Sequence, residues 1–522
     1  MHRFKTREGI CILLAALVFA ACLAVTVGNY AAYGEHNLDS DMSSEFVLAQ
    51  LLNEEGRLIT DSWYYSTEIR LVSPLPVYQL TLALFGSWHT ARTVSIAILL
   101  VLMALSLLYL ARGVGCSAPS ALLCASAIIL PLTKYQAFVL NYGGFYTVWC
   151  IAVFLLIGLV VRMDRGRLRE PVLILLLGFA CGMCGVRMLM ICAAPLLAAC
   201  VLMFFLELRG CDSLRTVAAR PASRIAVGGV LAAAAVFAGY IVNAKVLSQH
   251  YHFADHSGTW FRSLDMNQLG NHIVLLFRFL GYRLGSVLFS RDGIASMLAI
   301  ALPIVGMIAV AILLGREPTA REHTLALFIP IALAMGILIN ALTIQENLLM
   351  PTSVSYYLPA VLLMIFAIFW VLDRLSGSLK ALCIPPMLVL VCVFLISNSV
   401  YRRTDVVTEP TEHEEIAELL LSEGCTQGYA TFWDGNVLTE LTDGQIEVFS
   451  VTNWENLEPY RWLQRTDHVT RRPQGRIFAI YRASDYENGV PGCDEERLVY
   501  LSDWTAVFIY DSDGEYRAAW ES

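Results

Sequence analysis

Long apolar runs separated by short polar segments fill most of the chain. A helix of about 20 residues crosses the roughly 30 Å hydrocarbon core of a bilayer, and runs of about 16 to 22 apolar residues are typical of such helices. Eleven runs have this form, at residues 10–28, 91–111, 117–139, 145–161, 171–186, 188–206, 225–242, 294–314, 323–342, 355–372 and 381–398. The pattern predicts an α-helical polytopic membrane protein with about eleven transmembrane helices.

Two further segments are predicted to lie on the membrane surface. One is a helix that ends at Gly56 and carries an apolar stripe formed by Val47, Leu48, Leu51 and Leu52. The other is residues 273–289, which are apolar enough to suggest a twelfth crossing but are interrupted by Arg278, Arg283 and Arg291. An extra crossing would also move a basic loop at 316–321 to the outside, so we expect an interfacial helix at 273–289.

The last part of the chain, residues 399–522, is predicted to be a small separate domain. Strand-like runs at 428–433, 445–451, 476–481 and 505–510 alternate with helical stretches at 412–422 and 459–467, which is typical of an α/β or α+β domain. Its Trp433, Trp454 and Trp462 either line a groove for a sugar or an acceptor or belong to the core, as is more common at this density of aromatic residues. Residues 1–398 then form the transmembrane domain, with a first outer loop at 29–90.

Composition excludes a soluble enzyme and gives the helices a direction. Apolar residues make up 57% of the 522 residues and charged residues only 15%, whereas soluble chains are about half apolar and a quarter charged. With a cytoplasmic N-terminus, short inner loops carry 16 of the 36 lysines and arginines, as the positive-inside rule requires. The loop at 29–90 has only Arg57 and Arg70 against eight carboxylates and belongs outside. We therefore expect a multi-pass protein of the cell membrane whose C-terminal domain is extracytoplasmic.

The first run and the cysteines leave alternatives open. The run follows a basic start and contains Phe19-Ala20-Ala21-Cys22, which resembles a lipoprotein cleavage box, but it is long enough to be an anchor. Of the 14 cysteines, Cys425 and Cys493 are the two in the exported part, and both a disulfide and two free thiols are open for them. Cys181 and Cys184 form a CxxC inside an apolar helix, where packing is expected rather than metal or redox chemistry.

The first outer loop carries the most informative polar residues. Asp39 and Asp41 stand at the start of the predicted surface helix. Aspartate is a preferred N-cap, and the helix dipole stabilises negative charge there, so capping is one interpretation. The other interpretation is catalytic, because a carboxylate held at the bilayer edge can act as general base on a hydroxyl acceptor while a lipid phosphate leaves.

The residues that follow resemble the motifs of a known family. In chain order these signals are Asp41, Gly56 fifteen residues later, Ser73-Pro74-Leu75, Phe85-Gly86 and Arg92. Residues 10–112 thereby resemble the GT-C membrane glycosyltransferases of the dolichyl-phosphate-mannose protein mannosyltransferase and aminoarabinose transferase type. Two positions depart from the family pattern, because Met42 stands where glutamate is usual and Ser73 stands where the first proline of a Pro-Pro pair is usual.

The resemblance implies an inverting glycosyltransferase that moves a sugar from a polyprenyl-phosphate donor to a hydroxyl of a cell-envelope glycan, lipid or protein. Asp41 would be the general base, and Asp39 would supply a second carboxylate in an Asp-x-Asp pattern seen in other GT-C branches. Such a donor needs cations at the outer interface to stabilise the leaving phosphate. The candidate substrate-binding residues are Lys134, Arg187, Arg278, Arg283 and Arg291, for which snorkelling to lipid headgroups is the alternative, together with Glu68.

No cofactor is expected, and other chemistries find little support in the sequence. Asp39 and Asp41 could hold a divalent cation bound to the donor phosphate, although the resembled transferases are thought to work without one. A second group of residues has a spacing that resembles a metal site, and it contains His250, His252, Asp255 and His256. Such a loop cluster is more often solvated surface. The sequence has no phosphate loop, dinucleotide fingerprint or basic nucleic-acid patch.

Two rival functional classes are weaker. A transporter or lipid flippase needs polar residues at the midplane of its spans and often has inverted repeats, whereas these spans are nearly free of acids and the carboxylates gather outside. A non-catalytic anchor that presents the C-terminal domain for binding is hard to reconcile with so many spans. We therefore favour the glycosyltransferase, and we expect Asp39 or Asp41 to face a cavity open to the outer surface and to lipid.

Overall fold

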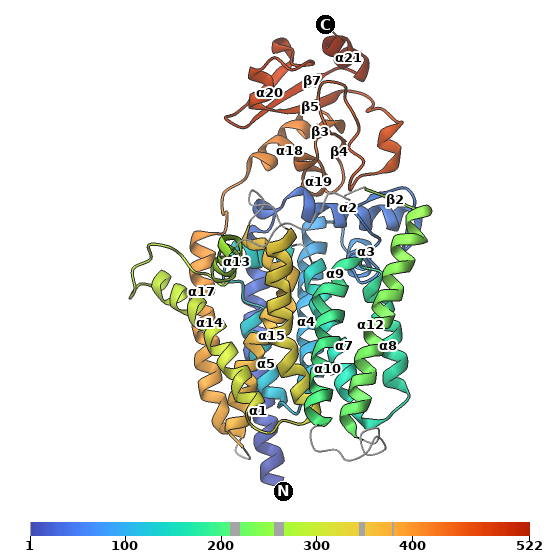
Figure 1. Ribbon diagram of the computed structural model, residues 1–522. Coiled ribbons are helices and arrows are strands. Elements are labelled where there is room, and N and C mark those ends of the chain that lie inside the picture. The colour runs from blue at the N-terminus through green and yellow to red at the C-terminus, as the bar shows by residue number, and fades with distance from the viewer. Residues whose placement is uncertain are drawn as a thin grey trace.

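The protein is a multi-pass helical bundle with a small sheet domain at one end (Figure 1). The computed structural model describes residues 2–142, 144–208, 220–254, 266–343, 350–377 and 380–521. Within these residues, nine helices are long and apolar enough to cross a membrane. The helices of the bundle are α1 (His2–Tyr33), α4 (Trp88–Gly113), α5 (Ala118–Ile128), α6 (Lys134–Ala137), α7 (Phe145–Val160), α8 (Arg169–Gly182), α9 (Val186–Met188), α10 (Ala194–Leu208), α12 (Pro221–Lys245), α14 (Arg291–Leu314), α15 (Ala320–Thr343), α16 (Leu358–Leu375) and α17 (Ile384–Thr404).

Two of the eleven predicted spans are shorter than the sequence pattern indicated. The prediction of one helix over 117–139 is wrong, because α5 ends at Ile128 and a new helix begins after Thr133, whose side chain accepts a hydrogen bond from Gln136 N. Pro131 lies in the break, where it lacks an N–H and disfavours helical geometry in the residue before it. The predicted span at 171–186 contains α8, which has 14 residues and packs along α12.

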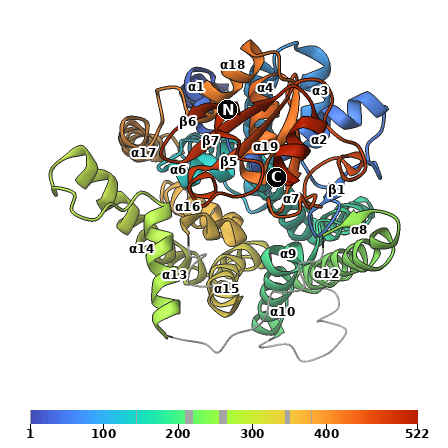
Figure 2. The same ribbon diagram turned by 90° about the horizontal axis from the view of Figure 1, so that it is seen from above.

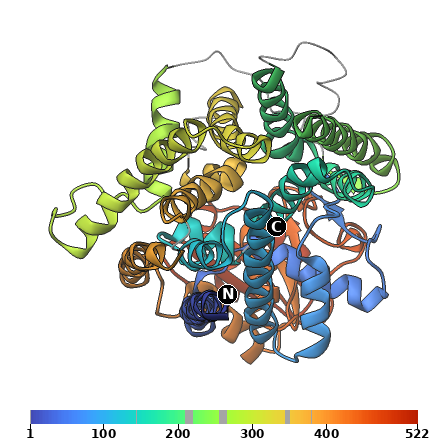
Figure 3. The same ribbon diagram turned by 90° about the horizontal axis from the view of Figure 1, so that it is seen from below.

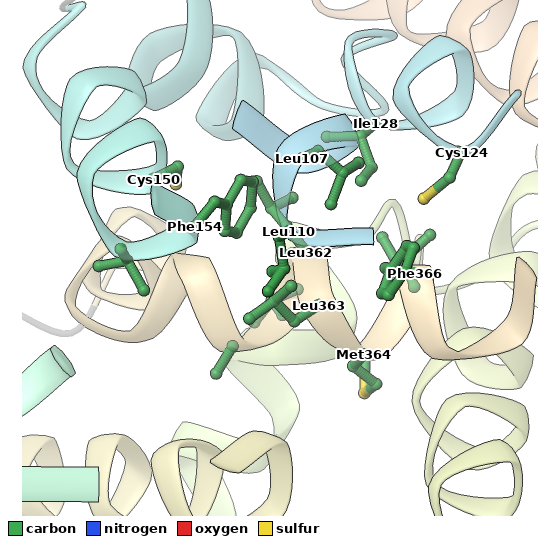
Figure 4. Packing of buried hydrophobic residues seen from close by; sticks show 14 of the residues in the cluster. Leu107, Leu110, Cys124, Ile128, Cys150, Phe154, Leu362, Leu363, Met364 and Phe366 are labelled. Atoms are coloured by element: carbon green, nitrogen blue, oxygen red, sulfur yellow. The ribbon is translucent and has the colours of Figure 1, made fainter. Parts of the chain in front are cut away.

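Helix α16 forms the centre of the bundle. Its span is 94% buried within the protein, far more than that of α1 or α14. Figure 4 shows Leu362, Leu363 and Phe366 of α16 among apolar side chains of α4, α5 and α7. Other helices of the bundle therefore enclose α16. The outer helices α1 and α14 lie at the periphery, as the view from below also shows (Figure 3).

A layer of short elements covers the end of the bundle that carries the sheet domain. It contains η1 (Glu35–Asn37), α2 (Ser40–Glu55), β1 (Tyr64–Tyr65), α3 (Leu75–Leu84), β2 (His252–Phe253) and α13 (Met266–Phe279). The helix predicted before Gly56 is present, since α2 buries Leu48, Leu51 and Leu52 and ends at Gly56, which adopts φ +65°, while its place on the membrane surface stays a prediction. That left-handed conformation is one that glycine adopts readily.

The interfacial helix predicted at 273–289 is wrong over its second half. Helix α13 ends at Phe279, and the chain from 280 to 290 is irregular, with positive φ at Gly281 and Gly285. This irregular segment exposes apolar side chains, including Leu284 and Phe289, and projects sideways from the bundle beside α14 (Figure 3).

The C-terminal region folds around a five-stranded mixed sheet in the order β4-β3-β5-β7-β6. Strand β3 pairs in parallel with β4 and β5, whereas β7 is antiparallel to β5 and β6. The elements are α18 (Glu412–Ser422), β3 (Gln427–Thr431), α19 (Phe432–Leu441), β4 (Glu447–Val451), β5 (Ile477–Arg482), α20 (Ala483–Glu487), β6 (Leu498–Leu501), β7 (Thr505–Tyr510) and α21 (Asp513–Glu521). The prediction of a small domain with mixed α and β structure is confirmed, while its division from the rest at residue 399 stays a prediction.

The structure corrects one prediction for this domain and decides one alternative that the sequence left open. The predicted helix at 459–467 is wrong: Pro459 pairs with Val451, and Leu463 adopts φ +47° and donates from its N to Tyr64 O over 2.8 Å, so this segment is irregular. Cys425 and Cys493 are free thiols, because Cys425 packs in the apolar cluster on one face of the sheet and Cys493 against the cluster on the other.

The sheet domain docks directly on the bundle and on α2. Seen from above, it covers the end of the bundle around α4 and α7 and leaves α10, α12, α14 and α15 uncovered (Figure 2). Helix α19 packs against α2. At the junction, Arg92 of α4 forms a fully buried ion pair with Glu440 of α19, and Trp88 N donates to Asp443 Oδ1 over 2.6 Å. The first outer loop is thereby enclosed between the bundle and the sheet domain.

Candidate functional site

The two aspartates at the start of α2 have different environments. Asp39 is the N-cap, and its Oδ1 accepts a hydrogen bond from Met42 N over 2.9 Å. Burial raises the pKa of Asp39 to about 6, while the bond from Met42 acts in the opposite direction. The capping interpretation therefore describes Asp39 as it stands in the structure.

Asp41 lies in the first turn of α2 and is open to solvent, unlike the residues on either side of it. The protein around it still removes enough water to raise the pKa of Asp41, and the nearby charges of Arg70 and Arg187 oppose that rise. Asp41 is thus an accessible carboxylate that the surrounding protein shields in part from water. Its two cationic neighbours come from the first outer loop and from α9.

Arg70 is the charged residue of the site that the sequence did not identify. Its side chain is 14% exposed, and it donates to Glu45 Oε1 over 2.9 Å and to Glu68 Oε1 over 3.3 Å. Its guanidinium also lies 4.8 Å from the centre of the Phe145 ring. Burial alone would lower the pKa of Arg70, but the two carboxylates raise it, so the group stays charged. Arg70 is thus a fixed cation whose own position is set by a pair of glutamates.

Glu68, predicted to bind substrate, lies beside Arg70 and accepts a hydrogen bond from it. It is 7% exposed, and Thr67 also donates to its carboxylate. Gly185, which precedes α9, adopts φ +79°, and a Cβ on it would lie 2.9 Å from Glu68 Oε2. Glycine therefore lets the start of α9 approach Glu68, and this approach brings Arg187 to the site.

Arg187 is the predicted cation that the structure places with Asp41. It is half-buried on α9, and its guanidinium lies 5.1 Å from the centre of the Tyr356 ring in η7 (Pro351–Tyr357). Tyr146, at the start of α7, is hydrogen bonded to Ser355 of the same segment and lies in the electrostatic range of Arg187. Residues from α2, α7, α9 and η7 thus converge at one end of the bundle.

The remaining predicted cations belong to a second group around Asp405, at the end of α17. Arg283 forms an ion pair with Asp405 over 2.7 Å, and Lys134 N donates to the other oxygen of that carboxylate over 3.2 Å, while the Lys134 side chain is exposed. Arg278 and Arg291 are exposed at the end of α13 and at the start of α14. Of the predicted cations, Arg187 therefore acts on the pKa of Asp41, and the cations of this second group do not.

The part of the chain that the structure describes contains no group of three or more His, Cys, Asp or Glu residues arranged to hold a metal ion. Of the predicted surface cluster, His250 and His252 are described, and Asp255 and His256 lie outside the described residues. Asp39 and Asp41 are the pair for which a divalent cation was considered, and the Asp39 carboxylate is engaged by Met42 N.

The sheet domain contributes the roof of the site. Ser40, beside Asp41, donates to the carbonyl oxygen of Trp433 over 2.9 Å and accepts from Val437 N over 3.3 Å. Burial, and after it the charge of Asp41, raises the pKa of the Tyr460 hydroxyl. A residue near 460 and one at 41 could be related only by the fold, since no local sequence pattern connects them.

The three tryptophans of the domain do not share one environment. Trp454 is 6% exposed and stacks on Tyr481 with ring centres 3.9 Å apart, so the core interpretation holds for it. Trp433 is 55% exposed at the start of α19, and Trp462 is half-buried.

Known structures share this architecture. ArnT from Cupriavidus metallidurans bound to undecaprenyl phosphate matches with a TM-score of 0.57 at 12% identity, over 95% of this chain and 97% of that one. AglB, an oligosaccharyltransferase of Archaeoglobus fulgidus, in complex with an inhibitory peptide and a dolichol-phosphate, matches with a TM-score of 0.51 at 13% identity, over 98% and 75%. The A. fulgidus oligosaccharyltransferase with Zn and sulfate also has a TM-score of 0.51, at 12% identity, over 91% and 68%.

No protein-family model and no curated protein sequence matches the chain. The likeness therefore lies in the fold, and this chain shares the overall fold of ArnT and AglB.

Proposed function

We propose that this protein is a glycosyltransferase that moves a sugar from a polyprenyl-phosphate donor to a hydroxyl group of a cell-envelope acceptor on the outer face of the membrane. The observation that carries the proposal is the environment of Asp41: a solvent-accessible carboxylate at the end of the bundle, whose pKa the charges of Arg70 and Arg187 lower against the effect of burial. The N-terminus is then cytoplasmic, and the C-terminal domain is extracytoplasmic.

In this proposal Asp41 is the general base. Its carboxylate takes the proton of the acceptor hydroxyl as the oxygen attacks the anomeric carbon, and the bond to the phosphate oxygen breaks on the opposite face, which inverts the configuration. A base must be ionised at the working pH, and Arg70 and Arg187 favour the ionised form against the effect of burial.

Arg187 is the group suited to the leaving phosphate. Negative charge develops on the phosphate oxygen as the glycosidic bond breaks, and a cation already in place stabilises it without reorganisation. Arg70 is engaged by Glu45 and Glu68, so its role is to position the carboxylates and to set the local field. The arginines around Asp405 would bind lipid headgroups, or the donor before it reaches the site.

The test compares Asp41→Asn with Asp39→Asn. Asparagine is as good an N-cap as aspartate, so Asp39→Asn preserves the start of α2 and serves as the matched control. Membranes that contain each variant receive undecaprenyl-phosphate-linked [14C]hexose or [14C]aminopentose, and radiolabel that enters the envelope fraction is counted. We expect Asp41→Asn to lower transfer by about 10²–10⁴-fold and Asp39→Asn to retain it.

A normal thermal unfolding midpoint for Asp41→Asn would show that the loss is chemical. Retained transfer by this variant would refute the assignment of the base, and the absence of transfer by the parent protein from every donor would refute the proposed function.

A further inference from the structure

Two adjoining pockets form a groove where the sheet domain meets β1 and β2, whose Tyr64, His252 and Phe253 line one of the pockets. They have volumes of about 490 and 510 Å³, and they share Thr452 and Tyr460 in their walls. We call them together the roof groove. Each has the size typical of a site for a small molecule, about 300–1,000 Å³. A ligand longer than one pocket would pass over the ring of Tyr460.

The roof groove lies where an open sheet offers a binding site. Thr431 and Arg482 line one pocket, and they end the parallel strands β3 and β5. From β3 the chain crosses to β4 on one side, while β5 lies on the other side, so the connections diverge at this point. Ligands of α/β sheets bind at such a divergence, outside the carboxyl ends of the strands.

The same end of the sheet faces the candidate catalytic residue. The main chain of Trp433 bonds to Ser40, which is next to Asp41, over 2.9 Å. Tyr460, in the wall shared by the two pockets, lies within electrostatic range of Asp41.

The lining of the roof groove combines exposed ring surface with balanced charge. Trp433 is 55% exposed there, and Tyr460 packs beside Phe432 with ring centres 5.7 Å apart. Three carboxylates and two arginines line the two pockets, and they are Glu455, Glu458, Asp485, Arg461 and Arg482. Such a mixture gives no net attraction for a polyanion, and the hydrogen-bonding groups are too many for an apolar chain.

These properties match the chemistry of an uncharged sugar chain. A pyranose ring has an apolar face of C–H groups that packs on aromatic rings, and its edge carries hydroxyls that pair with carboxylates and guanidinium groups. We infer that the roof groove binds the acceptor, and that the bound part of the acceptor is a neutral oligosaccharide that reaches Asp41 past Tyr460. This inference rests on the proposed function, because it names the acceptor of that transfer.

The experiment measures binding to the full-length protein in lipid nanodiscs. The probes are hexaoses of glucose, mannose and N-acetylglucosamine, and a hexapeptide serves as the comparison ligand. Trp433→Ala removes the exposed ring but keeps the main-chain bond to Ser40, and Trp433→Phe keeps an aromatic face. Trp504→Ala is the matched control, because Trp504 is 79% exposed in the same domain and does not line either pocket.

We expect at least one hexaose to bind, Trp433→Ala to weaken its association constant about tenfold, and Trp433→Phe to restore most of it. In transfer assays Trp433→Ala raises the KM for the acceptor and leaves the KM for the donor unchanged. The inference is overturned if no hexaose binds, if Trp433→Ala and Trp504→Ala bind equally well, or if only the hexapeptide depends on Trp433.

The same data separate this inference from the proposed function. Loss of transfer in Asp41→Asn with no effect of Trp433→Ala on binding leaves the glycosyltransferase in place and removes the roof groove as acceptor site. Hexaose binding that depends on Trp433, with normal transfer by Asp41→Asn, keeps the roof groove as acceptor site and refutes Asp41 as the base.

Discussion

The ion pair between Arg92 and Glu440 offers a quantitative test of how the sheet domain is held over the site. The Arg92 side chain is 0% exposed and that of Glu440 is 3% exposed, and Nη2 of the arginine lies 2.6 Å from Oε2 of the glutamate. Arg92 also donates to the carbonyls of Tyr142 over 2.7 Å and Met42 over 3.1 Å. Glu440→Gln removes the negative charge and leaves the arginine buried among these neutral partners.

The expected cost follows from burial. Removing one partner of a buried ion pair costs about 3–5 kcal/mol, because the remaining charge is left uncompensated. Arg92 keeps two carbonyl acceptors, and its guanidinium lies 4.5 Å from the centre of the Phe46 ring. These contacts place the loss of docking free energy at the lower end of that range, at about 3 kcal/mol. The fraction of protein with its sheet domain undocked then rises roughly 100-fold.

Pulse proteolysis in nanodiscs, over a urea series, measures the free energy of this opening. The double variant Arg92→Met/Glu440→Gln removes both charges and should recover more than half of the loss, since a buried pair replaced by groups of similar volume is often tolerated. Asp61→Asn, in the exposed pair of Arg57 and Asp61, is the control and should change little. A loss below about 0.5 kcal/mol for Glu440→Gln, or additive effects in the double variant, would refute the reasoning.

Two further predictions concern pH. Arg187→Gln removes a cation that lowers the pKa of Asp41, so the acid limb of kcat/KM for transfer should move to higher pH, while Arg187→Lys should keep it; an unmoved limb in Arg187→Gln would contradict the pairing. Burial alone would raise the pKa of Glu447, but hydrogen bonds from His468 and Arg471 hold it at about 2, below the ordinary 4.5. This group therefore contributes stability that is present above about pH 4.5 and is lost as the pH falls towards 2, and Glu447→Gln should flatten the acid side of a thermal unfolding curve measured against pH.

The parts of the fold that follow from local pattern could be predicted from the sequence. The apolar runs gave the long spans, and the stripe before Gly56 gave α2 with its end at the correct residue. The strands β3, β4, β5 and β7 and the helix α18 lie where alternation and turn residues place them. In each of these the local preference and the burial agree.

The failures have two physical causes. Over 117–139 hydropathy alone outweighed Pro131, although a proline without an N–H interrupts a helix whatever the surrounding polarity. Over 459–467 the spacing of apolar residues is that of a helix. Hydrogen bonds to the first outer loop, such as that from Leu463 N to Tyr64 O, hold the segment in a non-helical conformation. No local pattern carries that second kind of information.

The candidate site divides in the same way. Asp41 and Arg187 could be found because a carboxylate and a cation at the edge of the membrane stand out in an apolar sequence. Arg70 left only a weak indication, as one of two cations in an otherwise acidic loop at 29–90. Its partners Glu45 and Glu68 could not be assigned to it before the fold was known. Glu45 lies in α2, whereas Glu68 and Arg70 lie in the irregular segment after β1, and no local pattern predicts how that segment returns to α2.

The bond between Ser40 and Trp433 has a consequence for the order in which the protein is made. The two residues are 393 positions apart, so the floor of the site leaves the ribosome first and its roof almost last. Domains fold as units during synthesis, N-terminal parts first. A chain that lacks its last hundred residues therefore already has the carboxylate and the bundle, but it has neither the main-chain partner of Ser40 nor the wall that contains Tyr460. The last part of the polypeptide to be made thus supplies the main-chain contacts that cover the start of α2.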